Sequence, residues 1–346
     1  HPRVRRQRQM CIRDRIVEKE KLLDIKDLSV TYKTEDGIVY AVNNLNLTLE
    51  PKETLGFVGE TGAGKTTTAM TIMGLLPTPP GKVTSGEIMF DGKDMLKIGD
   101  KERRGILGEK ISMIFQDPMT SLNPSMKVGD QIVEMIRLHK VIGKKEAFEE
   151  ACGLLEMVGI RRERANDYPH QFSGGMKQRV VIAIALACRP KMIIADEPTT
   201  ALDVTIQAQV MNLIKGLKEK LGTSMILITH DLGIVAEICD KVAIMYAGQV
   251  VEYAEVSKIY HNPCHPYTKG LFNSIPKLDT EEDWLEEIHG LPPEPTERID
   301  GCSFNPRCPN CMEICKHKKP EITVVNGEHY TRCFLYEKQE EVNKDE

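Results

Sequence analysis

The octapeptide that decides the fold reads Gly59-Glu60-Thr61-Gly62-Ala63-Gly64-Lys65-Thr66. It fits the pattern G-x-x-x-x-G-K-[ST], in which glycines let backbone N–H groups turn inward around an anion. The apolar run Thr54–Val58 precedes it, and helical spacing follows from Thr67 as far as Pro77. Strand, glycine loop and helix in this order predict a nucleoside triphosphate site. Lys65 would reach the β and γ phosphate oxygens, and Thr66 would offer its hydroxyl to Mg²⁺.

Further apolar segments predict the rest of an α/β core. A helix is expected at Val180–Cys188, and strands at Met192–Ala195 and Met225–Thr229 are too apolar to have a solvated face. We therefore expect parallel strands covered by helices. Helical periodicity between Val128 and Val158 predicts a helical insert. Alternating or turn-bounded segments predict further strands at 22–25, 44–49, 86–92 and 111–115, the first two forming a small β region.

Composition excludes two broad classes of protein. The 346 residues carry 46 Lys and Arg against 51 Asp and Glu, a net charge of −5, so no general basic field exists to hold nucleic acid. The longest apolar stretch, Val180–Cys188, is about half of the length that crosses a bilayer. No hydrophobic segment of secretory type lies near the start. We therefore expect a cytoplasmic protein whose ten cysteines are thiols or metal ligands rather than disulfides.

Two adjacent carboxylates end the strand predicted at Met192–Ala195. Neighbouring side chains of a strand point to opposite sides, so Asp196 and Glu197 can serve different tasks. We expect Asp196 to face the Mg²⁺ shell and Glu197 to face the water that attacks the γ-phosphate. Alone, the pair would equally fit capping carboxylates at the end of a strand; the phosphate-binding loop favours the catalytic interpretation.

A second cluster of small residues opens the helix before Val180. Ser173-Gly174-Gly175-Met176 would make another anion site at a helix N-terminus, although one triphosphate does not need two. Together with Gln116, Asp203 and His230, these residues resemble the nucleotide-binding subunits of ABC transporters. The resemblance implies that two such domains pack head to tail, and that Ser173 to Met176 of one domain closes on the ATP that the other domain holds.

The resemblance also implies roles for single residues. Gln116 would touch Mg²⁺ and relay to a membrane partner, Asp203 would cross the dimer interface, and His230 would hold the γ-phosphate and orient the water. Relatives stack adenine on an aromatic residue upstream of the phosphate-binding loop. Tyr32 is the first candidate here and Tyr40 the rival, although either fits a half-buried strand tyrosine. Residues 59–67, Gln116 and Asp196 complete the expected ATP site.

Longer strings narrow the resemblance to the ATPases of dipeptide and oligopeptide importers, a group that includes nickel importers. They are residues 116–124, 195–209 and 262–268. The implied fold is a P-loop ABC ATPase at residues 21–274, with a RecA-like core, an antiparallel β subdomain and a helical subdomain at about 120–175. A basic extension, residues 1–20, would precede the fold, and a Cys-rich extension, residues 275–346, would follow it as a separate tail.

The same resemblance implies the setting of the protein. ATP hydrolysis would drive uptake of peptides, with nickel or another solute as an alternative cargo. The partners would be a second ATPase subunit, giving a heterodimer, two permease subunits and an extracytoplasmic solute-binding protein, and the chain would sit peripherally on the cytoplasmic face of the membrane. A rival function is an ABC ATPase without a transporter, acting on nucleic acid or ribosomes. Such proteins generally carry a long coiled-coil insertion or two ATP sites, and neither is found in this sequence.

Cysteines near the C-terminus predict a metal centre. Cys302, Cys308, Cys315 and Cys333 follow the spacing C-x5-C-x6-C-x17-C, with Cys311 as an alternative ligand. Four thiolates can bind Zn²⁺ or an iron–sulfur cluster, and the spacing does not choose between them. Resemblance to the importer ATPases favours a [4Fe–4S] cluster, with Zn²⁺ as the alternative. The other cysteines lack companions and are expected to be packing or incidental residues: Cys11, Cys152, Cys188, Cys239 and Cys264.

Overall fold

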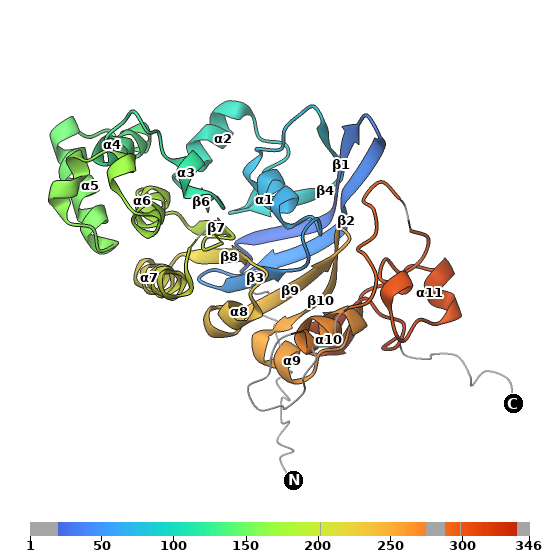
Figure 1. Cartoon of the computed structure of the whole chain (residues 1–346). Helices are drawn as coiled ribbons and strands as arrows, with labels where there is room; N and C mark the ends of the chain where they lie inside the picture. Colours follow the sequence, from blue (N-terminus) through green and yellow to red (C-terminus); the bar gives the residue numbers. More distant parts are fainter. Residues whose placement is uncertain (1–19, 201, 275–287, 298, 338–346) are drawn as a thin grey trace, which may run out of the picture.

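The computed structural model describes residues 20–200, 202–274, 288–297 and 299–337 (Figure 1). Most of the predicted basic extension 1–20, including Cys11, lies outside these residues, as do residues 275–287 and 338–346 of the predicted C-terminal extension. Two sheets form the centre of the described chain, with helices packed around them. None of its helices combines the length and apolarity that crossing a membrane requires.

The larger sheet holds the phosphate-binding loop. Its strand order is β11-β12-β10-β9-β3-β8-β7-β6, and the five strands from β9 to β6 are parallel. Every residue of β3, β7, β8 and β9 is buried, which confirms the prediction of strands with no solvated face. The bounds are β3 Thr54–Val58, β6 Ile111–Ile114, β7 Met192–Asp196, β8 Ser224–Ile228, β9 Lys241–Tyr246, β10 Gln249–Glu255, β11 Thr323–Asn326 and β12 His329–Thr331.

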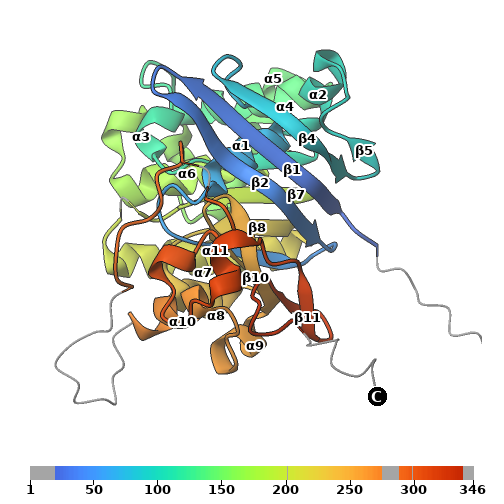
Figure 2. The same ribbon diagram turned by 90° about the vertical axis from the view of Figure 1, so that its right-hand side faces the viewer.

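The smaller sheet is antiparallel, as predicted. Its order is β2-β1-β4-β5, and Figure 2 shows β1, β2 and β4 running side by side across the molecule. One face of these strands packs on the helix that follows the phosphate-binding loop. The apolar side chains of the smaller sheet, of this helix and of the larger sheet form one shared core. The bounds are β1 Leu23–Thr34, β2 Gly37–Leu49, β4 Gly81–Phe90 and β5 Lys93–Asp94.

A helical group lies beyond β6 and β7, at the side of the molecule opposite the C-terminal segment (Figure 1). Its apolar side chains share one buried cluster with the outer part of the large sheet. The predicted insert between Val128 and Val158 forms α4 and α5 of this group. The bounds are α3 Pro118–Ser121, α4 Val128–His139, α5 Lys144–Met157, η1 Arg162–Asn166, η2 Pro169–Gln171, α6 Gly174–Leu186 and α7 Val204–Leu221. Two further helices lie outside this group: α2 Asp100–Ile106 packs into the core that the two sheets share, and α8 Leu232–Ile238 packs against β3.

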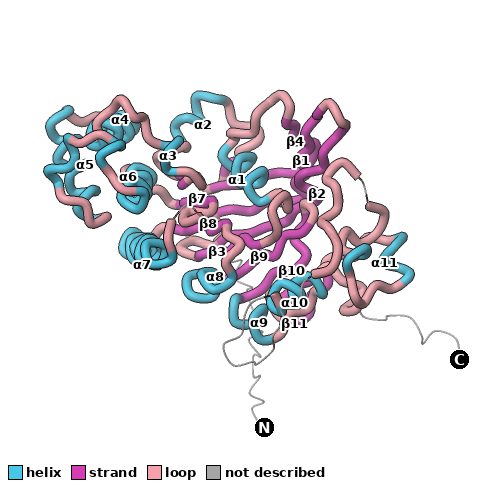
Figure 3. Tube along the Cα trace, in the orientation of Figure 1, coloured by secondary structure: helices cyan, strands magenta, loops and turns pink. Residues whose placement is uncertain are grey.

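The C-terminal segment joins the core sheet, whereas the sequence predicts a separate tail. Strand β12 pairs with β10, and Phe304 is buried against the aromatic rings of Tyr246 and Tyr267. Much of the chain around α11 is nevertheless loop (Figure 3). The remaining elements are α9 Val256–His261, α10 Pro266–Asn273, η3 Asn305–Arg307 and α11 Glu313–His317.

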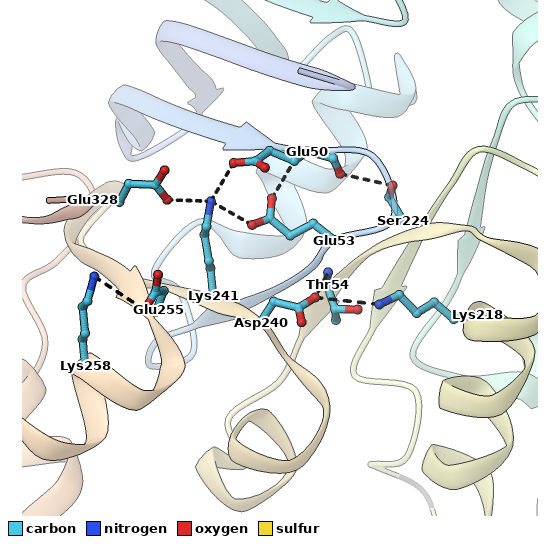
Figure 4. Close-up of polar contacts among 10 residues, drawn as sticks. All are labelled: Glu50, Glu53, Thr54, Lys218, Ser224, Asp240, Lys241, Glu255, Lys258 and Glu328. Atoms are coloured by element: carbon cyan, nitrogen blue, oxygen red, sulfur yellow. Dashed lines mark hydrogen bonds and ion pairs between the residues drawn. The ribbon is translucent and has the colours of Figure 1, made fainter. Parts of the chain in front are cut away.

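A charged cluster fixes the β11–β12 hairpin to the core (Figure 4). The ammonium group of Lys241 lies 3.0 Å from Glu50, 2.9 Å from Glu53 and 3.0 Å from Glu328, the last on the hairpin. Burial opposes the charge of Lys241, but hydrogen bonds to the three carboxylates outweigh it and raise the pKa of this lysine. Short strand pairing and this charged cluster thus hold the hairpin in addition to the apolar contacts of Phe304.

Candidate functional site

The phosphate-binding loop, residues 59–66, connects β3 to α1 (Lys65–Met73). Gly64 precedes the helix at φ 101°, a left-handed conformation that disfavours any side chain, and a Cβ there would lie 2.2 Å from the carbonyl oxygen of Ala41. No side chain caps the helix, so its first backbone N–H groups are free to bind an anion. Helix α1 ends at Met73 rather than near Pro77, because Gly74 adopts a left-handed conformation and closes it.

Lys65 is buried inside this loop. Its ammonium group donates to the carbonyl oxygens of Gly59 at 2.6 Å and Glu60 at 3.0 Å. Burial lowers the pKa of Lys65, while the charges of Glu197, Asp196 and Glu60 act in the opposite direction. The ammonium group thus occupies the mouth of the loop, next to the two acids that end β7.

Glu197 follows β7 in an unusual backbone conformation. Its φ is +44°, in the left-handed region that side chains rarely adopt, and its N–H donates to the carbonyl oxygen of Ile228 at 2.9 Å. Such conformations carry a free-energy cost and cluster at functional sites. The Glu197 side chain is 19 % exposed, whereas Asp196 before it is buried.

Three side chains surround the Glu197 carboxylate. The amide of Gln116 donates to it at 3.0 Å, the hydroxyl of Thr200 donates at 2.9 Å, and Nδ1 of His230 lies 3.6 Å away. The structure therefore brings Gln116, Glu197 and His230 together, as the sequence analysis expects. Thr200 is a partner that the analysis missed, although it lies three residues after Glu197 in one of the quoted strings.

Asp196 is the buried member of the acid pair. It accepts a hydrogen bond from the hydroxyl of Thr66, while burial raises the pKa of Asp196 more than this bond lowers it. Thr66 and Asp196 offer oxygen atoms, and Gln116 has an amide oxygen, which are the donors that Mg²⁺ prefers. The donor set therefore fits Mg²⁺ chemistry.

The two candidate adenine-stacking residues lie in different surroundings. Tyr32 on β1 donates from its hydroxyl to the Thr67 side chain at 3.3 Å, beside the start of α1. Tyr40 on β2 lines a cavity of about 340 Å³ with residues 60–63 and the Pro-rich stretch 292–297, and its N–H donates to the Pro295 carbonyl. Both residues are near the loop, and the choice of Tyr32 stays a prediction.

Ser173 to Met176 form the exposed start of α6. The hydroxyl oxygen of Ser173 accepts from the N–H of Met176 at 3.4 Å, and a Cβ on Gly175 would lie 2.5 Å from the Ile206 side chain on α7. Asp203 caps α7, accepting from the N–H of Ile206 at 3.0 Å. This cluster therefore adjoins α7, whereas the phosphate-binding loop adjoins β7 and the C-terminal segment.

Four cysteines of the C-terminal segment line one small cavity. They are Cys302, Cys308, Cys315 and Cys333, the four first-choice ligands, whereas the alternative ligand Cys311 is exposed and lies off the cavity. Burial raises the pKa of Cys302 to about 12 and that of Cys333 to about 11. A set of converging thiols is suited to soft metal ions, and binding would require these thiols to lose their protons.

A second group with metal-ligand chemistry has a different function. Glu252, Cys264 and His329 are buried with their ligand atoms within 4.8 Å of one another. The Glu252 carboxylate already accepts from the backbone N–H groups of Cys264 and His265 and from His329 at 2.8 Å. These three donors satisfy and orient the buried carboxylate. Glu252 therefore serves as a buried anchor between β10, α10 and β12.

Two residues from the last third of the chain reach the phosphate-binding loop. The N–H of Glu60 donates to the hydroxyl oxygen of Tyr267 at 3.0 Å, and Arg307 pairs with the Glu60 carboxylate at 2.9 Å. Tyr267 lies in the string 262–268, which contributed to the family resemblance but suggested no role for this residue. Nothing in the sequence pointed to Arg307, because a contact across 247 positions depends on how the C-terminal segment folds.

Comparison with known proteins supports the same assignment. A family model for the ABC transporter matches residues 42–200, and a model for the oligopeptide/dipeptide transporter C-terminal region matches residues 251–315. The oligopeptide transport ATP-binding protein OppD of Salmonella typhimurium is 53 % identical over 90 % of this chain and 93 % of that protein. The chain belongs to the ATP-binding subunits of oligopeptide and dipeptide ABC transporters.

Other members and solved structures agree with this family assignment. The dipeptide transport ATP-binding protein DppD of Bacillus subtilis is 49 % identical, covering 93 % of this chain and 97 % of that protein. A dimeric post-hydrolysis structure of the ATP-binding cassette MJ0796, bound to ADP and phosphate, superposes with a TM-score of 0.61 at 30 % identity, covering 68 % of this chain and 98 % of that chain. The chain is an ABC-type ATPase, and the predicted P-loop α/β fold is confirmed.

Proposed function

We propose that this ATPase uses Glu197 as its general base and drives the import of dipeptides or oligopeptides. The observation that carries the proposal is the Glu197 carboxylate, held by Gln116, Thr200 and His230 at the end of β7. A general base needs to be placed within hydrogen-bond reach of its water, with its orientation fixed by neighbours. The names of the peptide-transport relatives support the cargo.

The phosphate-binding loop would hold the triphosphate. Free N–H groups at the start of α1 would cradle the phosphates, and Lys65 would leave the Gly59 and Glu60 carbonyls to contact the β and γ oxygens. The Thr66 hydroxyl, the Asp196 carboxylate and the Gln116 amide oxygen would hold the Mg²⁺ that accompanies ATP. This metal would neutralise charge that develops on the phosphates.

Glu197 and His230 would then act on the attacking water. Glu197 would accept the proton of the water, and His230 would orient that water and contact the γ-phosphate. Gln116 links the metal side of the site to Glu197 through its 3.0 Å hydrogen bond. A movement of the Gln116 side chain would therefore shift the Glu197 carboxylate directly.

A facing ATPase subunit would complete each site. Ser173, Gly174 and Gly175 present a helix N-terminus at the surface, adjoining α7 rather than the phosphate-binding loop of their own chain. We expect them to close on ATP held by a second, different ATPase subunit, with Asp203 at the interface. The dimeric MJ0796 structure with bound ADP and phosphate is consistent with this mode of pairing.

A permease would dock on the groove beside Gln116. This apolar groove of about 600 Å³ runs between α2, β6 and the helical group, and Phe115 and Leu138 expose 40 % and 73 % of their surface in it. Exposed apolar surface of this kind marks interaction sites. Since Phe115 precedes Gln116 in the chain, a permease seated there would sense the γ-phosphate side of the ATP site. The solute-binding protein would act on the outer side of the permeases.

The four cysteines that line the small cavity would hold a metal group in the C-terminal extension. We propose a [4Fe–4S] cluster on Cys302, Cys308, Cys315 and Cys333, because these thiols converge on one cavity. The group would supply cross-links between loops that have little apolar core of their own. Anaerobically purified protein should absorb broadly near about 400 nm. Colourless protein with stoichiometric zinc would assign the site to Zn²⁺ instead.

The catalytic assignment is tested by Glu197→Gln, with Glu219→Gln on the exposed face of α7 as its matched control. In the assembled transporter, Glu197→Gln should lower ATP turnover at least about 100-fold while ATP binding is kept. Glu219→Gln should turn over like the wild type. Equal rates for Glu197→Gln and wild type would remove Glu197 as the base.

A further inference from the structure

Glu60 of the phosphate-binding loop is held from three directions. Its carbonyl oxygen accepts from Lys65 at 3.0 Å, and its N–H donates to the hydroxyl oxygen of Tyr267 at 3.0 Å. Its carboxylate oxygens accept from one terminal nitrogen of Arg307 at 2.9 and 3.2 Å. Two of these three contacts come from residues outside the P-loop core, so the C-terminal third of the chain helps to set the shape of the loop.

Arg307 uses its whole guanidinium group in its contacts with Glu60, Tyr246, Ile288 and His289, which are called the Arg307 joint below. The nitrogen that pairs with Glu60 also donates to the Tyr246 hydroxyl at 3.4 Å, at the end of β9. The other two nitrogens donate to the carbonyl oxygens of His289 at 3.2 Å and Ile288 at 3.3 Å. The side chain is only 6 % exposed. A planar, always-charged fork of this kind is suited to several fixed partners at once.

An aromatic cluster holds the backbone turn that carries Arg307. Phe304 and Arg307 lie on the same turn, and the Phe304 ring packs 5.2 Å from the ring of Tyr246 and 5.4 Å from that of Tyr267. The next residue, Cys308, lines the cysteine cavity. The position of Arg307 is therefore set by rigid neighbours, and flexible surface contacts have little part in it.

We propose that Arg307 is a positioning residue of the ATP site, supplied by the C-terminal segment, which neutralises Glu60 and fixes the phosphate-binding loop for the triphosphate. This inference rests on the proposed ATP-binding function. A carboxylate in the loop, without a cation beside it, would repel the negative phosphates of ATP. The buried Arg307 removes that repulsion and holds the loop residue through its side chain.

The proposal makes a specific claim about charge. Wild-type chain has a neutral Glu60–Arg307 pair, Arg307→Gln leaves a net charge of −1 beside the loop, and the double variant Arg307→Gln/Glu60→Gln restores neutrality. We expect Arg307→Gln to weaken ATP binding about tenfold and the double variant to bind within about twofold of the wild type. The single variant Glu60→Gln should bind ATP at least as tightly as the wild type.

The experiment measures the dissociation constant of a fluorescent ATP analogue for the purified full-length chain. Arg332→Gln is the matched control, because Arg332 lies in the same segment and its side chain donates to the carbonyl oxygen of Asn44 rather than to the loop. It should bind like the wild type. Arg307→Lys keeps the charge without the fork and should show an intermediate loss of about threefold. In the assembled transporter, Arg307→Gln should raise KM for ATP and leave kcat within about twofold.

Different outcomes distinguish the two proposals. A wild-type chain that fails to bind the analogue would overturn the proposed function itself. A folded Arg307→Gln chain that binds like the wild type would overturn the role of Arg307 alone. A double variant as weak as Arg307→Gln would also overturn the charge argument, because general loosening of the segment is not repaired by removing a second polar contact. If Arg307→Gln does not fold, Arg307→Lys tests the positioning role by itself, and an Arg307→Lys chain that binds like the wild type would overturn that role.

Discussion

Helices α1 and α6 both follow a small residue, Gly64 and Ser173 respectively, but their N-termini lie in different surroundings. The start of α1 has no side-chain cap and adjoins Lys65, the acids of β7 and the Arg307 joint. The start of α6 is capped by the Ser173 hydroxyl, is partly exposed, and packs beside α7, α3 and η1. The first terminus lies beside a buried cation and two acids, whereas the second presents backbone donors at the surface. This difference supports the proposal that α1 binds ATP within its own chain and that α6 meets ATP held by a facing subunit.

Removal of Lys65 should abolish most of the ATP binding and turnover that depend on the start of α1. Lys65→Ala should lower kcat/KM for ATP by about 10³-fold, because the only buried cation in residues 59–66 is lost. ATP binding by the isolated chain should fall with it. Lys177→Ala, on the exposed first turn of α6, is the control and should leave binding by the isolated chain unchanged. Equal losses in the two variants would mean that the two termini do not differ.

Blocking α6 should separate binding from turnover. In Gly175→Asp the new side chain would meet Ile206 and place a negative charge where a γ-phosphate is expected. The isolated chain should bind ATP within about twofold of the wild type, whereas turnover in the assembled transporter should fall at least about tenfold. Weakened binding by the isolated chain would show that α6 serves the site of its own chain.

Loss of the proposed metal group should weaken ATP binding at the start of α1 and leave the start of α6 unaffected. The cysteine cavity lies behind Arg307, so Cys308→Ser should weaken ATP binding by about threefold through the Arg307 joint. Pairing that depends on Gly175 should be unchanged at saturating ATP. Chain that keeps full ATP affinity without the metal would show that the joint does not need it.

Metal retention should also depend on pH in a defined direction. Burial raises the pKa of Cys302 to about 12 and that of Cys333 to about 11, so these thiols are protonated at neutral pH when no metal is bound. Binding must release protons, and affinity should therefore rise with pH by up to about tenfold per unit for each proton released. Competition with a chelator at pH 6.5 and 7.5 measures this. Equal retention at both values would exclude these cysteines as ligands.

Asp203, which caps α7 beside the α6 terminus, should affect stability. Asp203→Ala removes the 3.0 Å hydrogen bond to the N–H of Ile206. It should lower the free energy of unfolding by about 1 kcal/mol, measured by urea denaturation. Asp203→Asn keeps a capping group and should restore most of this stability. If both variants are equally unstable, the cap does not explain the position of Asp203.

Sequence alone predicted where the residues around α1 lie in the fold, but it did not predict the contacts that the C-terminal segment makes with them. Residues 59–66 and the acids of β7 follow continuous apolar strands, and such strands reveal both the sheet and its active edge. The contacts of Thr200, Tyr267 and Arg307 depend on tertiary packing, which the sequence does not reveal. Strand β12 is only three residues long, too short to show a strand pattern. The buried partners that hold this strand, Glu252 and His329, look like ordinary polar residues until the fold brings them together.

The central claim is that α1 and α6 of one chain belong to two different ATP sites. The most direct measurement is a cryo-EM structure of the transporter with Glu197→Gln in this chain, trapped with MgATP. The account predicts that the Ser173 hydroxyl and the Gly175 N–H lie within about 3.2 Å of a γ-phosphate bound by the phosphate-binding loop of the facing subunit. Closed, ATP-filled subunits in which Ser173 and Gly175 contact no triphosphate, or contact the one held by their own residues 59–66, would contradict it.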